Sequence, residues 1–237
     1  MKPSRFLIVN ADDFGQSAGI NRGIITAHEQ GIVTSASLMV RWPFAKQAAD
    51  YARAHRNVSI GLHVDLGEWF YDHGEWRALY EVVDNNDERA VAAEVGRQLE
   101  SFRALMGQDP THIDSHQHVH LQEPVTSLLV AAAKQFGVPL RICSSEISYC
   151  GGFYGQTAEG EHLPNVISVA GLNRILAELG NGVSELGCHP GFADDLDTMY
   201  KRERAEEVMV LCDPQVQGTI GELGIELISF SELPVTA

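Results

Sequence analysis

The chain has 237 residues, 44% of them hydrophobic, and a formal net charge of -15 at pH 7. This length and apolar content suit one globular domain, which we expect to span residues 1–237. Because an acidic surface repels polyanions, nucleic acid and anionic membranes are poor candidates for the main partner. No apolar run reaches the length of a membrane span, and four separated cysteines without a C-x-x-C pair suit free thiols, so we expect a cytoplasmic protein.

Short β-rich segments alternate with segments of helical periodicity along most of the chain. Apolar and β-branched runs predict seven strands, at residues 6–10, 33–40, 58–63, 111–116, 139–143, 183–189 and 225–230. Apolar residues at helical spacing predict helices at residues 17–30, 43–54, 88–106, 123–136, 172–179 and 202–211. Strands and helices that alternate in this way predict a parallel sheet, which could be a barrel or an open doubly wound sheet.

Two stretches show no clear periodicity. Residues 144–168 are irregular, and residues 64–85 hold several aromatic side chains among charges and a glycine: Trp69, Phe70, Tyr71, Trp76 and Tyr80. Sugar rings have apolar faces, so such a segment suits a sugar-binding wall. The same side chains could equally pack the segment onto its own domain, and both interpretations stay open.

The positions of the polar residues favour a barrel. The Asp12–Asp13 pair, His63, His116 and His189 all lie at or just after the carboxyl ends of predicted strands. A barrel brings these ends together on one face, where barrel active sites lie, whereas an open sheet would spread the outermost ends apart. We therefore expect an α/β fold, a TIM-like (β/α) barrel of about seven parallel strands.

Residues 111–120 contain four of the chain's ten histidines and one aspartate: His112, His116, His118, His120 and Asp114. If the segment is extended, these even-numbered side chains share one face, which predicts a surface for metal binding or proton transfer. His112 and His116 would share a face on a helix as well, but Pro110 and the alternation favour a strand. We expect His118 and His120 to touch substrate or to support the ligands.

A divalent ion that activates water needs about three protein ligands and an open position. Asp13, His63 and His116 would supply one oxygen and two nitrogens. Asp12 would then accept a proton from the bound water, provided that the backbone turns at Asp12 so that both carboxylates face inward. His189 could protonate a leaving nitrogen. By ligand type alone this set suits zinc, cobalt or iron(II) better than magnesium.

Four motifs resemble, in the same order along the chain, those of the YdjC-like carbohydrate deacetylases, which include chitooligosaccharide deacetylases and deacetylases associated with hopanoid biosynthesis. They are NADDFG at residues 10–15, GLH at 61–63, THIDSHQHVH at 111–120 and CHPGF at 188–192. The resemblance extends from residue 6 to about residue 230. It implies an irregular β/α barrel related to polysaccharide deacetylases, and removal of an acetyl group from an N-acetylated sugar with a divalent ion, often magnesium.

The resemblance also implies roles for individual residues. Asp13, His63 and His116 would bind the metal, Asp12 would be the general base, and His189 would be the general acid or a substrate contact. Arg141 and Tyr154 match family positions near the site, where Arg141 would orient a carboxylate. The family often carries His at the position of Gln117, a departure that leaves the ligands intact but would alter the substrate or the surroundings of the ligands.

Two other functions fit parts of the pattern. A phosphoesterase on a barrel would also bind metal, but it commonly uses several ions and basic residues, and few basic residues lie near the motifs. A catalytically silent sugar-binding protein would keep the fold without the reaction. We expect a small carbohydrate as the ligand, Mg²⁺ as the cofactor with Zn²⁺ or Co²⁺ as alternatives, and allow for a homodimer.

Overall fold

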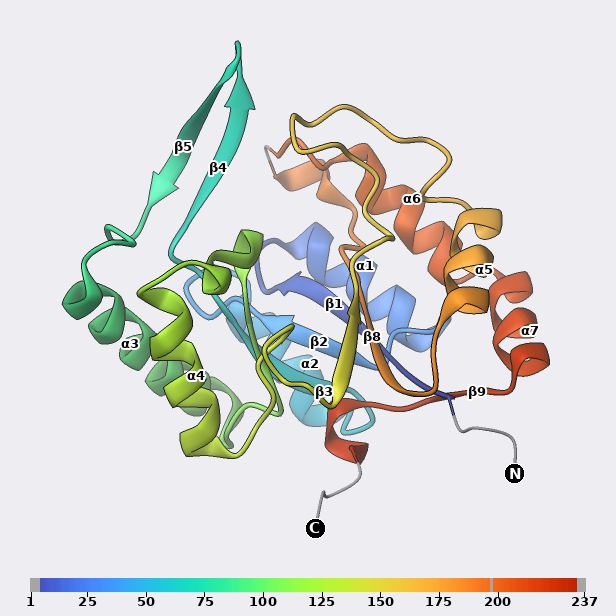
Figure 1. The fold of residues 1–237 in the computed structure, drawn as a ribbon, viewed down its shortest axis with the longest axis horizontal. Helices are drawn as coiled ribbons and strands as arrows, with labels where there is room; N and C mark the ends of the chain where they lie inside the picture. The colour runs from blue at the N-terminus through green and yellow to red at the C-terminus, as the bar shows by residue number, and fades with distance from the viewer. Residues whose placement is uncertain (1–4, 197, 234–237) are drawn as a thin grey trace.

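The computed structural model describes residues 5–196 and 198–233, which form a curled parallel sheet with helices packed around it (Figure 1). The sheet has seven strands in the order β6-β3-β2-β1-β8-β7, and β9 pairs with the beginning of β1. All pairings in this sheet are parallel. The strands are β1 (Arg5–Phe14), β2 (Ser35–Leu38), β3 (Ser59–Val64), β6 (Ile113–Ser115), β7 (Ile147–Cys150), β8 (Gly182–Cys188) and β9 (Ile225–Leu227).

Seven helices accompany the sheet in the described residues: α1 (Ala18–Glu29), α2 (Ala45–Ala54), α3 (Glu88–Met106), α4 (Val125–Phe136), α5 (Val169–Glu178), α6 (Arg202–Leu211) and α7 (Pro214–Leu223). In Figure 1, α3 and α4 lie on one side of the central strands, and α5, α6 and α7 lie on the other. Apolar side chains of the strands and helices form one large core. No helix of the described residues is long and apolar enough to span a membrane.

This architecture confirms the expected irregular barrel, which is incomplete because the sheet ends at β6 and β7. The predicted bounds of α3 and α6 match the observed helices. At the start of α1, the Ser17 side chain accepts a hydrogen bond from the backbone N–H of Ile20, which is the predicted cap.

One predicted strand is wrong. Residues 139–143 contribute only a single bridge, from Leu140 to Ile113, because the chain turns at Ile142, whose φ is 66°. A φ in this left-handed region ends an extended segment, and it is rare for a β-branched residue. The seventh strand is instead β7, which lies in the segment that the sequence pattern left irregular.

A hairpin and a helix were also not predicted. Residues 64–85 contain an antiparallel hairpin of β4 (Gly67–Asp72) and β5 (Glu75–Glu81), which projects from the body of the protein in Figure 1. Helix α7 follows α6 directly, although the chain signals it well. Asp213 caps its start, Pro214 stands in its first turn and Gly224 ends it in the left-handed conformation.

Candidate metal and active site

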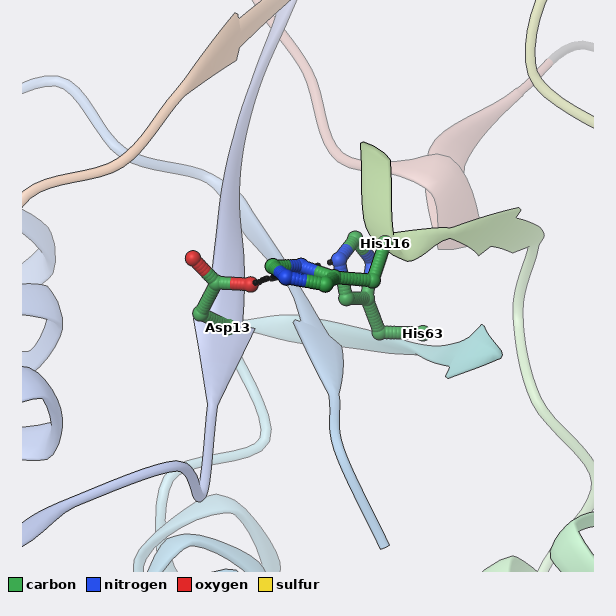
Figure 2. Close-up of side chains that lie close together, drawn as sticks. All are labelled: Asp13, His63 and His116. Atoms are coloured by element: carbon green, nitrogen blue, oxygen red, sulfur yellow. Dashed lines mark hydrogen bonds and ion pairs between the residues drawn. The ribbon is translucent and has the colours of Figure 1, made fainter. Parts of the chain in front are cut away.

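Three side chains that the sequence analysis assigned to a metal ion converge at the carboxyl ends of the strands. Asp13 lies near the end of β1, His63 on β3 and His116 directly after β6. Asp13 Oδ1 is 3.3 Å from His63 Nε2 and 3.1 Å from His116 Nδ1, and Figure 2 shows both rings directed at this carboxylate. One ligand atom from each residue lies within 4.8 Å of the others, and all three residues are buried.

The two neighbouring aspartates both face the site because the backbone changes direction at Asp13. The φ angle of Asp13 is 67°, in the left-handed region that few residues other than glycine adopt. The turn that the sequence analysis required at Asp12 therefore occurs one residue later. Both Asp12 and Asp13 line a cavity of about 830 Å³.

Electrostatics around the three ligands favour a cation. Burial alone would lower the pKa of His116, but the carboxylates of Asp13 and Glu68 raise it to about 9. His116 Nε2 is buried and has no hydrogen-bond partner within the described residues. Divalent ions in proteins are bound by histidine nitrogens and carboxylate oxygens. A buried ring nitrogen without a hydrogen-bond partner, close to carboxylates, is therefore available as such a ligand. The residues present therefore fit a metal ion.

Asp114 orients one of these ligands. Its Oδ1 lies 2.7 Å from His63 Nδ1, which leaves His63 Nε2 to face Asp13. A carboxylate behind a histidine in this way fixes the ring and its tautomer, as in many metal sites. A second set of residues that could bind a metal ion consists of Asp12, His63 and Asp114. Both carboxylates of this set already form ion pairs with Arg141.

Arg141 lies between three buried carboxylates. Its guanidinium donates to both oxygens of Asp12, at 2.6 and 2.7 Å, and lies 2.8 Å from Asp114 and 2.7 Å from Glu185. Burial is the largest influence on the pKa of Asp12 and raises it, but the charge and hydrogen bonds of Arg141, together with the charge of His63, hold this pKa below its ordinary value. Burial dominates at Glu185, whose pKa rises to about 7. Arg141 thus orients the Asp12 carboxylate and keeps it ionised.

His189 directly follows β8 and lies near Asp12. Its Nε2 is 3.7 Å from Asp12 Oδ2, and burial lowers its pKa to about 4, so the ring is neutral at pH 7. The ring lies against Tyr154 and Tyr200, which stack on each other with centroids 4.4 Å apart. Tyr154 therefore lies at the cavity, where the resemblance placed it.

Helix α6 supplies two charged residues that the sequence analysis missed. Arg204 Nη2 donates to Asp13 Oδ2 at 2.6 Å, and its Nη1 donates to the backbone oxygen of His189. Glu207 accepts hydrogen bonds from the backbone N–H of His189 and from the hydroxyl of Tyr200. Arg204 and Glu207 are three residues apart and share one face of α6, so buried charges at helical spacing were the available signal.

The expected single face of histidines is wrong. The chain is extended only over β6, and then enters a 3-10 turn, η1 (His116–Leu121), in which Gln117 and His118 have φ angles of 50° and 53°. His118 lines the cavity and its Nε2 lies 3.3 Å from the Tyr149 hydroxyl. His120 does not line the cavity: its Nδ1 lies 2.6 Å from Ser115 Oγ and its Nε2 lies 3.1 Å from the backbone oxygen of Arg141.

His112 is part of the packing beneath the site. Its ring stacks on Phe230 with centroids 3.7 Å apart, and its Nε2 lies 3.0 Å from Ser37 Oγ, which also donates to Asp114. His112 does not line the cavity. Its link to the site is the hydroxyl of Ser37, which lies next to both His112 and Asp114.

The aromatic side chains of the hairpin have two different environments. Trp69 and Trp76 line the cavity, whereas the Tyr80 hydroxyl donates to Asp65 and its ring packs against Trp42. The packing interpretation is therefore correct for Tyr80, which attaches the hairpin to the body. The sugar-binding interpretation stays a prediction for Trp69 and Trp76, which line the cavity.

Comparisons with known proteins show the family to which the chain belongs. The model of the YdjC-like protein family matches residues 6–222, so the chain belongs to this family. A carbohydrate deacetylase of Geobacillus stearothermophilus is 32% identical over 96% of this chain and 98% of the relative. A chitooligosaccharide deacetylase of Serratia marcescens is 34% identical over 97% of this chain and 99% of the relative.

Solved structures share the fold. A protein of Enterococcus faecalis V583, named for cellobiose-phosphate cleavage, superposes with a TM-score of 0.77 and 26% identity, covering 98% of this chain and 100% of its own. A family 4 carbohydrate esterase from Streptomyces lividans in complex with acetate superposes with a TM-score of 0.55 and 14% identity, covering 96% and 95%.

Proposed function

We propose that this member of the YdjC-like family is a metal-dependent hydrolase that removes the acetyl group from an N-acetylated sugar and releases acetate. The substrate would be an oligosaccharide or glycolipid that contains N-acetylglucosamine. The observation that carries this proposal is the convergence of five groups at one site. Asp12, Asp13, His116 and His189 line the cavity, and His63 lies 3.3 Å from Asp13. The names of the two deacetylase relatives support it.

Asp13, His63 and His116 would hold the ion, which we propose to be Mg²⁺, with Zn²⁺ or Co²⁺ as alternatives. When bound there, a divalent ion supplies Lewis acidity, which polarises the acetamide carbonyl and acidifies water. Arg204 holds the second oxygen of Asp13, so it keeps the carboxylate turned toward the two histidines. Asp114 does the same for the ring of His63.

Asp12 is the general base of the proposed reaction. Because Arg141 keeps this carboxylate ionised, it can accept the proton of the water that attacks the acetyl carbon. The attack forms a bond between the water oxygen and this carbon and gives a tetrahedral intermediate. Asn10 also donates to Asp12, so the carboxylate has a fixed orientation before the substrate binds.

His189 would carry the proton to the leaving nitrogen. Its ring is neutral at pH 7, so it must receive a proton before it can donate one. Asp12 Oδ2, 3.7 Å from His189 Nε2, is in place to pass on the proton taken from water. The carbon–nitrogen bond then breaks as the nitrogen is protonated, leaving acetate and an amino sugar.

The cavity is poorly suited to a phosphorylated substrate. Among the described residues that line it, Arg204 is the only arginine or lysine, and its guanidinium is already bound to Asp13. A phosphoesterase site would present cations or bidentate donors to the phosphate oxygens. This observation favours an uncharged acetylated sugar over a sugar phosphate.

Acetate release tests the proposal directly. The native protein would be incubated with N-acetylglucosamine, short chitooligosaccharides and N-acetylglucosaminyl lipids, with magnesium, zinc or cobalt added. We expect metal-dependent release by the native protein and by the surface control His55→Ala, and none by His116→Ala. A thermal shift with sugar but no acetate from any substrate would instead identify a sugar-binding protein.

A further inference from the structure

The β4–β5 hairpin carries aromatic side chains on one face. Tyr71 pairs with Trp76 across the hairpin, and Trp69 pairs with Ala78, so Trp69, Tyr71 and Trp76 point to the same side. Trp69 and Trp76 are diagonal neighbours, a relation that separates residues by about 7–8 Å. The rings of Tyr71 and Trp76 pack edge to face with centroids 5.6 Å apart. Three aromatic side chains thus lie on one face of the hairpin, and two of them, Trp69 and Trp76, line the cavity.

This face of the hairpin lines the same cavity as the proposed catalytic residues. One cavity of about 830 Å³ is lined by Asp13 and His116 and also by Trp69 and Trp76 of the hairpin. Pockets that bury a drug-sized ligand measure roughly 300–1,000 Å³. The cavity is therefore near the upper end of this range, which leaves room for more than the single ring that would be deacetylated.

The exposure of Trp76 is unusual for its residue type. It is 55% exposed, although tryptophan usually buries most of its surface, and it belongs to β5. The hairpin of β4 and β5 projects from the body of the protein (Figure 1). A flat aromatic ring covers the apolar C–H face of a sugar ring, while the indole N–H can donate to a hydroxyl. Asn85 and Gln122 on the cavity lining add hydrogen-bonding groups.

Gln117 fixes this face of the hairpin relative to the metal ligands. Its side-chain amide accepts from the backbone N–H of Trp69 at 2.9 Å and donates to the backbone oxygen of Trp69 at 2.8 Å. Gln117 directly follows His116, and Glu68 beside Trp69 lies 3.5 Å from His116 Nε2. The hairpin is thus held in place before a ligand binds, which reduces the entropy lost on binding.

From these observations we propose that the Trp69–Trp76 face of the hairpin binds the sugar rings that adjoin the ring to be deacetylated. The substrate is then an oligosaccharide, and the hairpin selects it over a single sugar. This inference rests on the proposed deacetylase function for the position of the reacting ring. Binding of further rings to the hairpin is a separate property and can be measured without turnover.

The test compares affinities for one ring and for three. Asp12→Asn protein with magnesium would be titrated by calorimetry with N-acetylglucosamine, with its β-1,4-linked trimer and with octyl N-acetylglucosaminide. In this background, Trp76→Ala should lower the ratio of trimer to monomer affinity by roughly tenfold, because one ring–aromatic contact is lost. Trp76→Phe, which keeps an aromatic ring, should lower it less.

Arg77→Ala is the matched control, because Arg77 adjoins Trp76 but points to the other face of the hairpin and pairs with Asp72. It should leave the ratio unchanged. The proposal is overturned if Trp76→Ala and Arg77→Ala have equal effects, if no sugar binds, or if Trp76→Ala weakens only the octyl glycoside. A change in oligomeric state without a change in the ratio would also overturn it, since Trp76 would then be a contact between chains.

The tests of the deacetylase function and of the hairpin site can fail independently. Acetate release by the native protein with a trimer-to-monomer ratio independent of Trp76 would leave the deacetylase and remove the hairpin site. Trp76-dependent trimer binding without acetate release from any substrate would support the hairpin site and refute the deacetylase.

Discussion

The floor and the hairpin wall of the cavity are built in opposite ways. The floor consists of the buried charged residues around Asp12 and Asp13. In it, the single guanidinium of Arg141 contacts three carboxylates, those of Asp12, Asp114 and Glu185. The wall is an antiparallel hairpin in which β5 is largely exposed and β4 is mostly half-buried. At its base, the two bonds between Gln117 and Trp69 connect it to the loop that carries His116.

This difference separates two tasks. Buried ion pairs require all of their partners, since removing one leaves an uncompensated charge, so the floor tolerates little change. An exposed hairpin with few contacts can change its side chains at small cost to stability. We infer that the floor performs the reaction, whereas the wall selects the substrate. The predictions below test this division.

The largest effect should follow from Asp12→Asn on the floor. Loss of a general base typically lowers a rate about 10²–10⁴-fold, and kcat for acetate release should fall by this amount. Metal affinity should stay close to native, because Asp13, His63 and His116 remain. Steady-state kinetics and metal titration measure the two quantities. Full activity in this variant would show that Asp12 is not the base.

Arg141→Met should be the most destabilising change. It leaves three carboxylates buried without their cation, and breaking a buried pair costs about 3–5 kcal/mol. Arg103→Met is the matched control, because Arg103 pairs with Asp109 at the surface and should change stability by less than about 0.5 kcal/mol. Urea denaturation of the two variants compares them. Equal stabilities would show that the floor does not depend on the Arg141 network.

Glu185→Gln should reveal a pH dependence of stability. Burial raises the pKa of Glu185 to about 7 in the folded protein, above its ordinary value, so folding favours the protonated carboxyl. Its contribution is therefore complete below about pH 4.5 and is lost as pH rises through 7. Relative to Glu185→Gln, the native protein should lose stability between pH 5 and 8, and denaturation at fixed pH measures this trend. A constant difference over this range would contradict it.

The smallest effect should follow from Gln117→Ala at the base of the wall. Two hydrogen bonds are lost, each worth about 0.5–1.5 kcal/mol, but the hairpin backbone stays exposed to water. Hydrogen exchange in residues 67–81 should accelerate, and KM for an oligosaccharide should rise with little change in kcat. Gln122→Ala, on the same cavity lining but without a bond to the hairpin, is the control for exchange. If hydrogen exchange in the hairpin is unchanged in Gln117→Ala, the two hydrogen bonds between Gln117 and Trp69 do not stabilise the hairpin.

The floor was largely predictable from the sequence. In a parallel α/β fold, residues that end successive strands meet at one edge, so Asp13, His63, His116 and His189 could be grouped without coordinates. The sequence pattern failed to place the histidines after His116, because side-chain alternation applies only to a regular extended backbone. The left-handed residues Gln117 and His118 direct His120 away from the cavity, and no alternation pattern encodes such a turn.

The wall was less predictable, for local reasons. Its strands join through His73 and Gly74, both with positive φ, whereas the strongest sequence signals for such a turn are Asn-Gly and Asp-Gly. The roles of Arg204 and Glu207 depend on how α6 docks against the site, which is a tertiary contact. Both features needed the folded structure because neither follows from a repeat along the chain.

Metal titration tests the central claim most directly, namely that Asp13, His63 and His116 form one divalent-ion site. Calorimetry with Mg²⁺ and Co²⁺ would compare native protein with Asp13→Asn, His116→Ala and the surface control His55→Ala. We predict one ion per chain for the native protein and the control, and affinity weakened by more than roughly a hundredfold in the two site variants. Equal binding in all four proteins would contradict the claim.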